Sequence, residues 1–216
     1  LIKCVNLVRL ELVEYVATVD NNLTQSALRI LSCFYVAYVS TEHVEISEEK
    51  LKEIPGIIEP LVLFALIWSV GASCIGSSRP KFDKLFRQIL KENAIAFPAA
   101  GSVYDYVYDI EQGKWIHWLK SVPDFKLDPK LKFTEITIPT KDSIRYTYLI
   151  KHLASQLKHV ICIGPTGTGK TVNIRNLLMS GMPKEFIPLF ITFSAQTSAN
   201  QTQDLIDSKL SKRRKG

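Results

Sequence analysis

The octapeptide Gly164-Pro165-Thr166-Gly167-Thr168-Gly169-Lys170-Thr171 decides how the rest of this chain is interpreted. It fits the pattern G-x-x-x-x-G-K-[ST], with an apolar run at 160–163 before it and a helical pattern after it. This order predicts a strand, a tight loop and a helix, whose backbone N–H groups surround a phosphate. Lys170 is expected to reach the β- and γ-phosphates, and the Thr171 hydroxyl to coordinate Mg²⁺. The sequence therefore predicts a nucleoside-triphosphate site rather than a glycine-rich turn without a ligand.

The sequence after this phosphate-binding loop (P-loop) is short. It contains one strand-like run at 186–193 and one amphipathic helical pattern, from about Ser198 to Leu210. No apolar run that ends in paired acids follows the loop, so the carboxylates expected to hold Mg²⁺ and activate water are missing. We therefore assign no catalytic residue and expect a piece of a larger protein, cut inside its nucleotide-binding domain. Unpaired strand edges and apolar faces are expected to make the isolated chain associate.

Composition and charge indicate which kinds of partner and cellular compartment suit this protein. The 216 residues are 46% hydrophobic and carry a net charge of +6, but five of the 27 basic residues lie in the tail Lys209–Lys215. The rest is nearly neutral, so no nucleic acid partner is expected; the tail is either a localisation or polyanion-binding patch or a solvated charged turn. The four cysteines are far apart, which predicts neither a zinc site nor disulfides and suits a reducing compartment. Cys162 is expected to be buried in the strand before the loop.

The first part of the chain reads as helical. Between Glu59 and Arg79 no residue is charged, yet Pro60, two glycines and four serines favour a buried core helix at 57–70 over a membrane span. Helices are also expected at Leu1–Ala17, at Leu23–Tyr38 with Asn21 or Asn22 as its cap, from Ser47, and from Arg79-Pro80.

From Phe97 onwards the composition changes, and the sequence predicts short strands that are rich in aromatic residues. Val103–Tyr108 and Lys114–Trp118 predict a β-hairpin with its turn near residues 111–113, and 133–138 predicts another strand. Asp105, Asp109 and Glu111 make stacking of single-stranded nucleic acid on these aromatic residues unattractive. Thr140 or Asp142 is expected to cap a helix that leads to the loop. Ile138, Thr140 and Arg145 either lie beside the base of the nucleotide or belong only to a capped helix start.

Several of these segments resemble one family. Phe193–Gln203 and Ser208–Gly216 closely resemble the dynein heavy chain after the P-loop of its third AAA+ module. Ile138–Arg145 is similar to the segment that leads into that module, and Phe64–Gly71 resembles a helix of the second module's lid. Phe97-Pro98, Lys114-Trp115 and Trp118 look like the connection between the two modules. The run with Gln196, Gln201 and Gln203 looks more like axonemal than cytoplasmic heavy chains.

The resemblance implies an α/β P-loop NTPase fold of the AAA+ type, incomplete, at 139–216. It implies a helical lid at 1–95 and a β-containing connector at 96–138. The parent would be an ATP-dependent microtubule motor of the cytoplasm and cytoskeleton, working in the axoneme of cilia or flagella. Its partners would be the other AAA+ modules of the same heavy chain, microtubules, and dynein intermediate and light chains, with no nucleic acid and no membrane.

For the site, the resemblance implies a regulatory ATP/ADP site with Mg²⁺. Position 171 is Thr where many relatives have Ser, and both supply a hydroxyl. Without the acidic residues, an arginine finger and the third module's lid, the chain is not expected to hydrolyse ATP efficiently alone. Two alternatives stay open. One is a complete small P-loop kinase or GTPase, although this sequence lacks the guanine-reading motif Asn-Lys-x-Asp. The other is a helical interaction domain with a vestigial P-loop, and the intact Lys170 and Thr171 argue against it.

Overall fold

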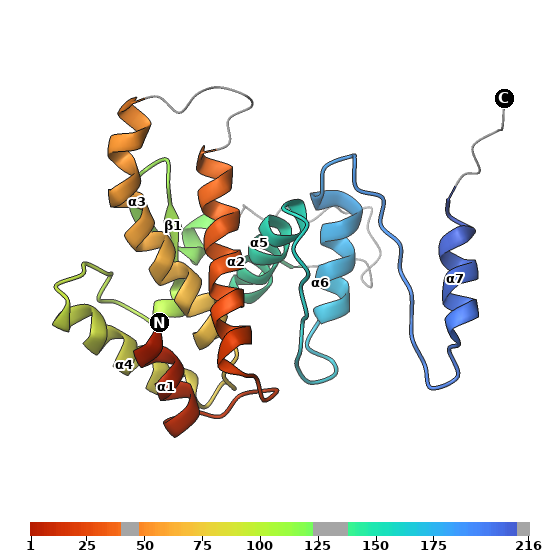
Figure 1. The fold of residues 1–216 in the computed structure, drawn as a ribbon, viewed down its shortest axis with the longest axis horizontal. Coiled ribbons are helices and arrows are strands. Elements are labelled where there is room, and N and C mark those ends of the chain that lie inside the picture. The colour runs from red at the N-terminus through yellow and green to blue at the C-terminus, as the bar shows by residue number, and fades with distance from the viewer. Residues whose placement is uncertain (40–47, 123–137, 211–216) are drawn as a thin grey trace. The chain divides into compact units, whose positions relative to one another are not determined.

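The structure, a computed structural model, describes residues 1–39, 48–122 and 138–210 (Figure 1). The chain divides into two compact units, residues 1–181 and 182–216. Three of the predicted features lie outside the described residues: the helix start at Ser47, the strand at 133–138 apart from its last residue, and the end of the basic tail. The α-helices of the first unit are α1 (Ile2–Glu11), α2 (Asp20–Val39), α3 (Glu48–Leu66), α4 (Arg79–Glu92), α5 (Lys141–Ser155) and α6 (Lys170–Asn176).

The predicted helix Leu1–Ala17 is too long, because α1 ends at Glu11. Residues 13–15 instead run antiparallel to residues 73–75, with an isolated bridge between Glu14 and Cys74. The Tyr15 amide donates to the Ser73 carbonyl at 3.0 Å. Pairing with a segment far away in sequence thus overrides the helical periodicity of residues 12–17.

Helix α2 begins at Asp20, so the predicted caps Asn21 and Asn22 lie inside its first turn. The amides of Asn22 and Leu23 already donate to the carbonyl of Val19. An acidic residue at the helix start suits the positive end of the helix dipole. The prediction of a helix over this segment is confirmed, and the prediction of its cap is wrong.

Helix α3 continues into a turn of π-helix, η1 (Ile67–Gly71), so the two helices predicted here form one. Pro55 and Pro60 lie inside α3, where each removes a backbone hydrogen bond. Burial of the apolar face outweighs this cost; its most buried members, at most 2% exposed, are Leu61, Phe64, Ala65, Ile67 and Val70. Lys52–Gly71 is long and apolar enough to cross a membrane, but 61% of its most apolar window is buried inside the protein, as expected of a core helix.

Helix α4 starts at the predicted Arg79-Pro80 and buries Phe82, Phe86 and Leu90 on one face. The predicted hairpin is also present, as β1 (Tyr106–Asp109) paired antiparallel with β2 (Lys114–His117). Its strands are shorter than predicted, since short 3₁₀ helices replace their outer ends, η2 (Val103–Asp105) and η3 (Trp118–Ser121). The Ser102 and Asp105 side chains cap η2 reciprocally, which favours a turn over an extended strand.

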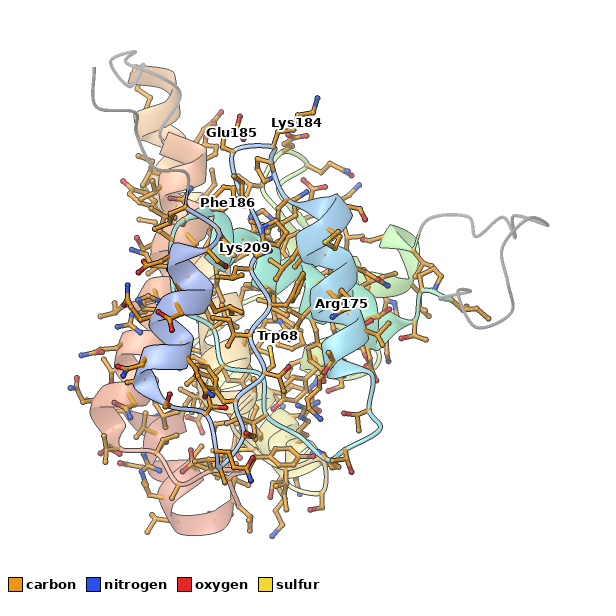
Figure 2. The ribbon with its side chains drawn as sticks, turned by 90° about the vertical axis from the view of Figure 1, so that its right-hand side faces the viewer. Trp68, Arg175, Lys184, Glu185, Phe186 and Lys209 are labelled. Atoms are coloured by element: carbon orange, nitrogen blue, oxygen red, sulfur yellow. The ribbon has the colours of Figure 1, made fainter. Side chains whose placement is uncertain are left out.

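These elements share one aromatic core in the first unit. In Figure 1, α2 lies between α3 and α5, and residues of both neighbours reach the ring of Phe34. Phe34 meets Phe64 edge-on at 5.2 Å between ring centroids and stacks on Tyr148 at 5.7 Å. Trp68, labelled in Figure 2, contacts Trp118 edge-on at 6.4 Å. The core therefore joins the predicted lid helices, the hairpin and α5.

The predicted strands on either side of the P-loop helix do not form ladders within the part of the chain that the structure describes. Residues 160–163 run without regular hydrogen bonding, and the side chain of Ile161 is 83% exposed. Cys162, expected to be buried, is exposed. In the second unit, residues 186–193 are likewise not part of a strand, and Ile187 is 91% exposed. An apolar run becomes a parallel strand only when neighbouring strands satisfy its amides and cover both faces.

The second unit contains α7 (Ala199–Asp207), whose bounds are close to those of the helix predicted from about Ser198 to Leu210. Ser198 is its N-cap: the Ser198 Oγ accepts a hydrogen bond from the Gln201 amide, and the Ser198 amide donates one to Gln201 Oε1. This reciprocal cap explains why the helix starts at that residue.

Candidate nucleotide-binding site

The P-loop octapeptide forms a tight turn that ends at the start of α6. Gly167 and Gly169 have φ angles of +79° and +75°, in the left-handed region that favours glycine. Gly169 is the N-cap of α6, and its carbonyl accepts the first helical hydrogen bond, from the Asn173 amide, at 3.0 Å. The two glycines let the backbone fold back on itself, as the sequence pattern predicted.

The Lys170 side chain folds over this turn. Its ammonium donates to the Pro165 carbonyl and, at 3.1 Å, to Thr168 Oγ1. Thr168 Oγ1 itself donates to the Pro165 carbonyl at 3.0 Å. A Cβ atom on Gly164 would lie 3.7 Å from Lys170 Cδ, so the lysine stem covers the first residue of the loop. The charge of Lys170 therefore lies inside the turn, where a phosphate held by loop amides would meet it.

Thr171, the residue predicted to bind Mg²⁺, is exposed in the first turn of α6. Among the described residues no group of three or more histidine, cysteine, aspartate or glutamate side chains is placed to hold a metal ion. One hydroxyl is nevertheless a suitable ligand, because Mg²⁺ at such sites takes most of its remaining oxygens from phosphates and water. Thr171 therefore fits a Mg²⁺ ion that a bound nucleotide brings.

Ile138, Thr140 and Arg145 lie at the start of α5, and their environments differ. Ile138 is 64% exposed. Thr140 caps the helix: its Oγ1 accepts from the Ser143 amide at 3.1 Å, and its own amide donates to Ser143 Oγ at 2.8 Å. The capped helix start, one of the two predictions for this segment, is thus confirmed for Thr140. Contact of these residues with a nucleotide base stays a prediction.

Arg145 is buried inside the first unit. It pairs with Asp142 at 2.6 Å, and its guanidinium lies 5.6 Å from the centroid of the Trp68 ring. Arg145 and Arg79 both donate to the Tyr146 hydroxyl at 3.4 Å. Burial acts to raise the pKa of Tyr146, but the bond from Arg79 and the charge of Arg145 lower it overall. Arg145 therefore ties α5 to the π-helix η1, a role that the sequence did not reveal.

The comparisons with known families match nearly the whole chain. Residues 1–120 match the family described as "Dynein heavy chain AAA lid domain", and residues 125–216 match "P-loop containing dynein motor region". The chain belongs to the dynein heavy chain family. Both matches support an AAA+ P-loop fold with a preceding helical lid, and neither supports a small kinase or GTPase.

The most similar relatives include several axonemal dynein heavy chains. The chain is similar to dynein axonemal heavy chain 1 of Mus musculus, at 42% identity over 98% of the chain, and to that of Homo sapiens, at 39% over 98%. It is also similar to dynein axonemal heavy chain 3 of Homo sapiens, at 34% identity over 99%. The chain spans 5–6% of the length of these relatives.

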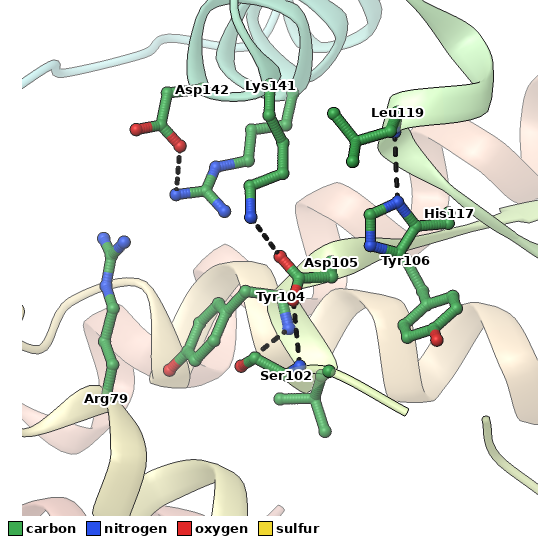
Figure 3. A network of polar contacts seen from close by, with 12 residues as sticks. Arg79, Ser102, Tyr104, Asp105, Tyr106, His117, Leu119, Lys141 and Asp142 are labelled. Carbon is green, nitrogen blue, oxygen red and sulfur yellow. Dashed lines mark hydrogen bonds and ion pairs between the residues drawn. The ribbon is translucent and has the colours of Figure 1, made fainter. Parts of the chain in front are cut away.

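Sequence reasoning missed one polar contact of this dynein heavy chain segment. Lys141, the first residue of α5, donates to Asp105 Oδ1 at 2.7 Å (Figure 3). The two residues are 36 positions apart, and the capping pattern Ser102-x-x-Asp105 signals only the local bond of the acid. The last residue of η2, directly before the hairpin, is thus bonded to the helix that leads to the P-loop.

Proposed function

We propose that residues 164–171 bind ATP or ADP with Mg²⁺ as a regulatory nucleotide site of a dynein heavy chain. The observation that carries this proposal is the closed turn of the octapeptide. Two left-handed glycines form the turn, and the Lys170 ammonium lies against it. A loop of this shape, at this place in a dynein P-loop region, suits the triphosphate of a nucleotide.

Each residue of the proposed site has a separate role. Backbone amides of the loop bind phosphate oxygens, and Lys170 neutralises the β- and γ-phosphates. Thr171 supplies one oxygen to the Mg²⁺ that accompanies the nucleotide. Ile138, Thr140 and Arg145 are proposed for the side of the base, with Arg145 acting through its hold on α5 rather than by contact. Hydrolysis is not assigned to this chain, because no acidic residue is proposed beside Thr171.

For the whole protein we propose an ATP-dependent microtubule motor located in the cytoskeleton, at the axoneme of cilia or flagella. The axonemal heavy chains that match almost the entire length of this chain support this location. Residues 1–95 would be the lid of one module, 96–138 the connector, and 139–216 the start of the next. The proposed partners are the neighbouring AAA+ modules, microtubules, and dynein intermediate and light chains.

Calorimetric titration of the purified chain with Mg-ATP and Mg-ADP tests the nucleotide site. We expect Lys170→Ala to weaken binding by roughly 100-fold, equivalent to about 3 kcal/mol for a charge-assisted contact with phosphate. Lys151→Ala, which removes an exposed lysine from α5, is the matched control and should bind like the unaltered chain. Thr171→Ala should weaken binding with Mg²⁺ present and have little effect in a chelator.

Two outcomes would contradict the proposal. The first is a folded chain that binds neither nucleotide, which would favour a vestigial loop. The second is binding that survives Lys170→Ala, which would place the nucleotide elsewhere on the molecule.

A further inference from the structure

The ion pair between Asp105 and Lys141 lies at the start of α5, beside the proposed base side of the nucleotide site. The two charged atoms are 2.7 Å apart, and the Asp105 side chain is only 14% exposed (Figure 3). A partly buried pair of this kind fixes geometry better than an exposed pair, because solvent competes less for its bonds. Lys141 directly follows Thr140, so the pair holds the residue next to the helix cap.

Asp105 is itself held rigidly. Its Oδ2 accepts from the Ser102 amide at 2.9 Å, and a Cβ atom on Gly101 would lie 2.9 Å from that oxygen. Gly101 has a φ of +63°, so glycine serves both the conformation and the close approach. Partial burial acts to raise the pKa of Asp105, but Lys141 and the Ser102 amide lower it overall. The carboxylate is thus present as the anion that Lys141 needs.

The segment that carries Asp105 is in turn bonded to α4. Asp83 Oδ1 accepts from the Val103 amide at 2.6 Å. Arg87 donates to the carbonyls of Pro98 at 2.7 Å and Gly101 at 2.9 Å. A continuous set of bonds therefore runs from α4 through residues 98–105 to the first residue of α5.

We propose that Asp105 is a positioning residue for base recognition: through Lys141 it fixes the start of α5, and with it the segment Ile138–Thr140. This inference rests on the proposed function, since it assigns that segment to the base of the nucleotide bound at residues 164–171. In sequence the loop follows the other end of α5, and it makes its own internal bonds. Loss of the pair should therefore weaken recognition of the base and leave the phosphate contacts intact.

The test compares two ligands, Mg-ATP and inorganic tripolyphosphate with Mg²⁺, which shares the phosphates and lacks the base. For Lys141→Met and Asp105→Asn we expect ATP affinity to fall roughly five- to tenfold, while tripolyphosphate affinity changes less than about twofold. Asn keeps an oxygen acceptor for the Ser102 amide, so Asp105→Asn removes mainly the charge. Lys141→Arg keeps the cation and should restore ATP binding.

Lys3→Met is the matched control, because it removes an exposed ion pair, to Glu92, between α1 and α4. It should change neither affinity. ATP affinity that is unchanged in Lys141→Met, or affinities for both ligands that fall in parallel, would overturn the positioning role. Equal affinity of the unaltered chain for ATP and tripolyphosphate would also overturn it and leave the phosphate site standing. Failure of the unaltered chain to bind either ligand would instead reject the proposed function.

Discussion

Two glycines in the same long helical segment have opposite surroundings. A Cβ atom on Gly71 would lie 2.6 Å from Phe82 Cε1 and 2.7 Å from the Tyr104 hydroxyl, whereas one on Gly56 would meet nothing within 4 Å. We expect Gly71→Ala to destabilise the protein by about 1–3 kcal/mol through overpacking. Gly56→Ala should stabilise it by about 0.5–1 kcal/mol through the lower entropy of the unfolded chain. Urea unfolding followed by circular dichroism measures both; equal effects would contradict the packing around Gly71.

His152 gives the first unit a dependence on pH. Its ring lies 4.8 Å from that of Phe34 and 4.3 Å from that of Tyr148. Burial lowers the pKa of His152, and the charge of Lys151 lowers it further. Because the folded pKa is below that of the unfolded chain, about 6.5, the unfolded chain binds the proton first as pH falls. The contribution of His152 to stability should therefore be present above the unfolded pKa and be lost as pH falls from 7.5 towards the folded pKa.

The comparison of unaltered protein with His152→Phe isolates this group. Phenylalanine keeps an aromatic ring between Phe34 and Tyr148 and removes the titration. The urea midpoint of the unaltered chain should fall more between pH 7.5 and pH 5.5 than that of the variant. Identical slopes in the two proteins would mean that His152 is not the responsible group.

At the residue scale, the sequence predicted the interactions within short segments but not the contacts between residues far apart in the chain. The loop glycines and the position of Lys170 follow from a short pattern whose geometry is set within eight residues. The burial of Arg145 against Trp68 depends on how α5 meets η1, which no local pattern encodes. For the same reason the sequence did not reveal the bond between Asp105 and Lys141.

At the scale of elements, two helices end on residues with an unusual backbone. Ala94 after α4 and Leu157 after α5 both have a φ of +54°. The bonds from Ile95 to Leu90 and from Lys158 to Leu153 are typical of a helix end that glycine normally completes. Leu157 is 78% exposed, so its side chain contributes little packing in return for the strain.

Ala94→Gly and Leu157→Gly should each raise the free energy of unfolding by up to about 1 kcal/mol. The left-handed conformation costs an L-residue roughly 1–2 kcal/mol, from which the greater entropy of unfolded glycine subtracts about 0.5–1 kcal/mol. Ala154→Gly, inside α5, is the control and should lower stability by about 1 kcal/mol. A loss of stability in all three variants would show that the ends of α4 and α5 are not strained.

The sequence predicted the existence of most elements better than their limits. α4, the hairpin and α7 have strong local signals, namely amphipathic periodicity, a glycine turn and a capping box. The end of α1 and the unbroken α3 depend on pairing and burial with distant residues, which local periodicity does not contain. The apolar runs at 160–163 and 186–193 show the same limit, since a strand is defined by its neighbours.

At the scale of the whole molecule, each unit carries exposed apolar surface beside the P-loop helix or α7. Ile161 in the first unit and Ile187 in the second are the most exposed residues of their apolar runs, at 83% and 91%. An apolar run that forms no strand ladder among the described residues is a template for pairing with another chain. We therefore expect the purified chain to self-associate at concentrations on the order of 10 µM and above.

A charge placed in either run should reduce this association without altering the fold. Ile161→Lys and Ile187→Lys remove side chains that contribute little to their own unit, so the thermal midpoint should stay unchanged while the monomer fraction rises. Gln112→Lys, in the hairpin turn, adds the same charge away from both runs and is the control. Sedimentation velocity over a concentration series measures the monomer fraction.

Two outcomes would mean that these runs do not drive association. One is an unaltered chain that is already monomeric, and the other is a pair of variants whose distribution of species equals that of the control. If the two runs act independently, the double variant Ile161→Lys/Ile187→Lys should show the sum of the two gains in monomer fraction.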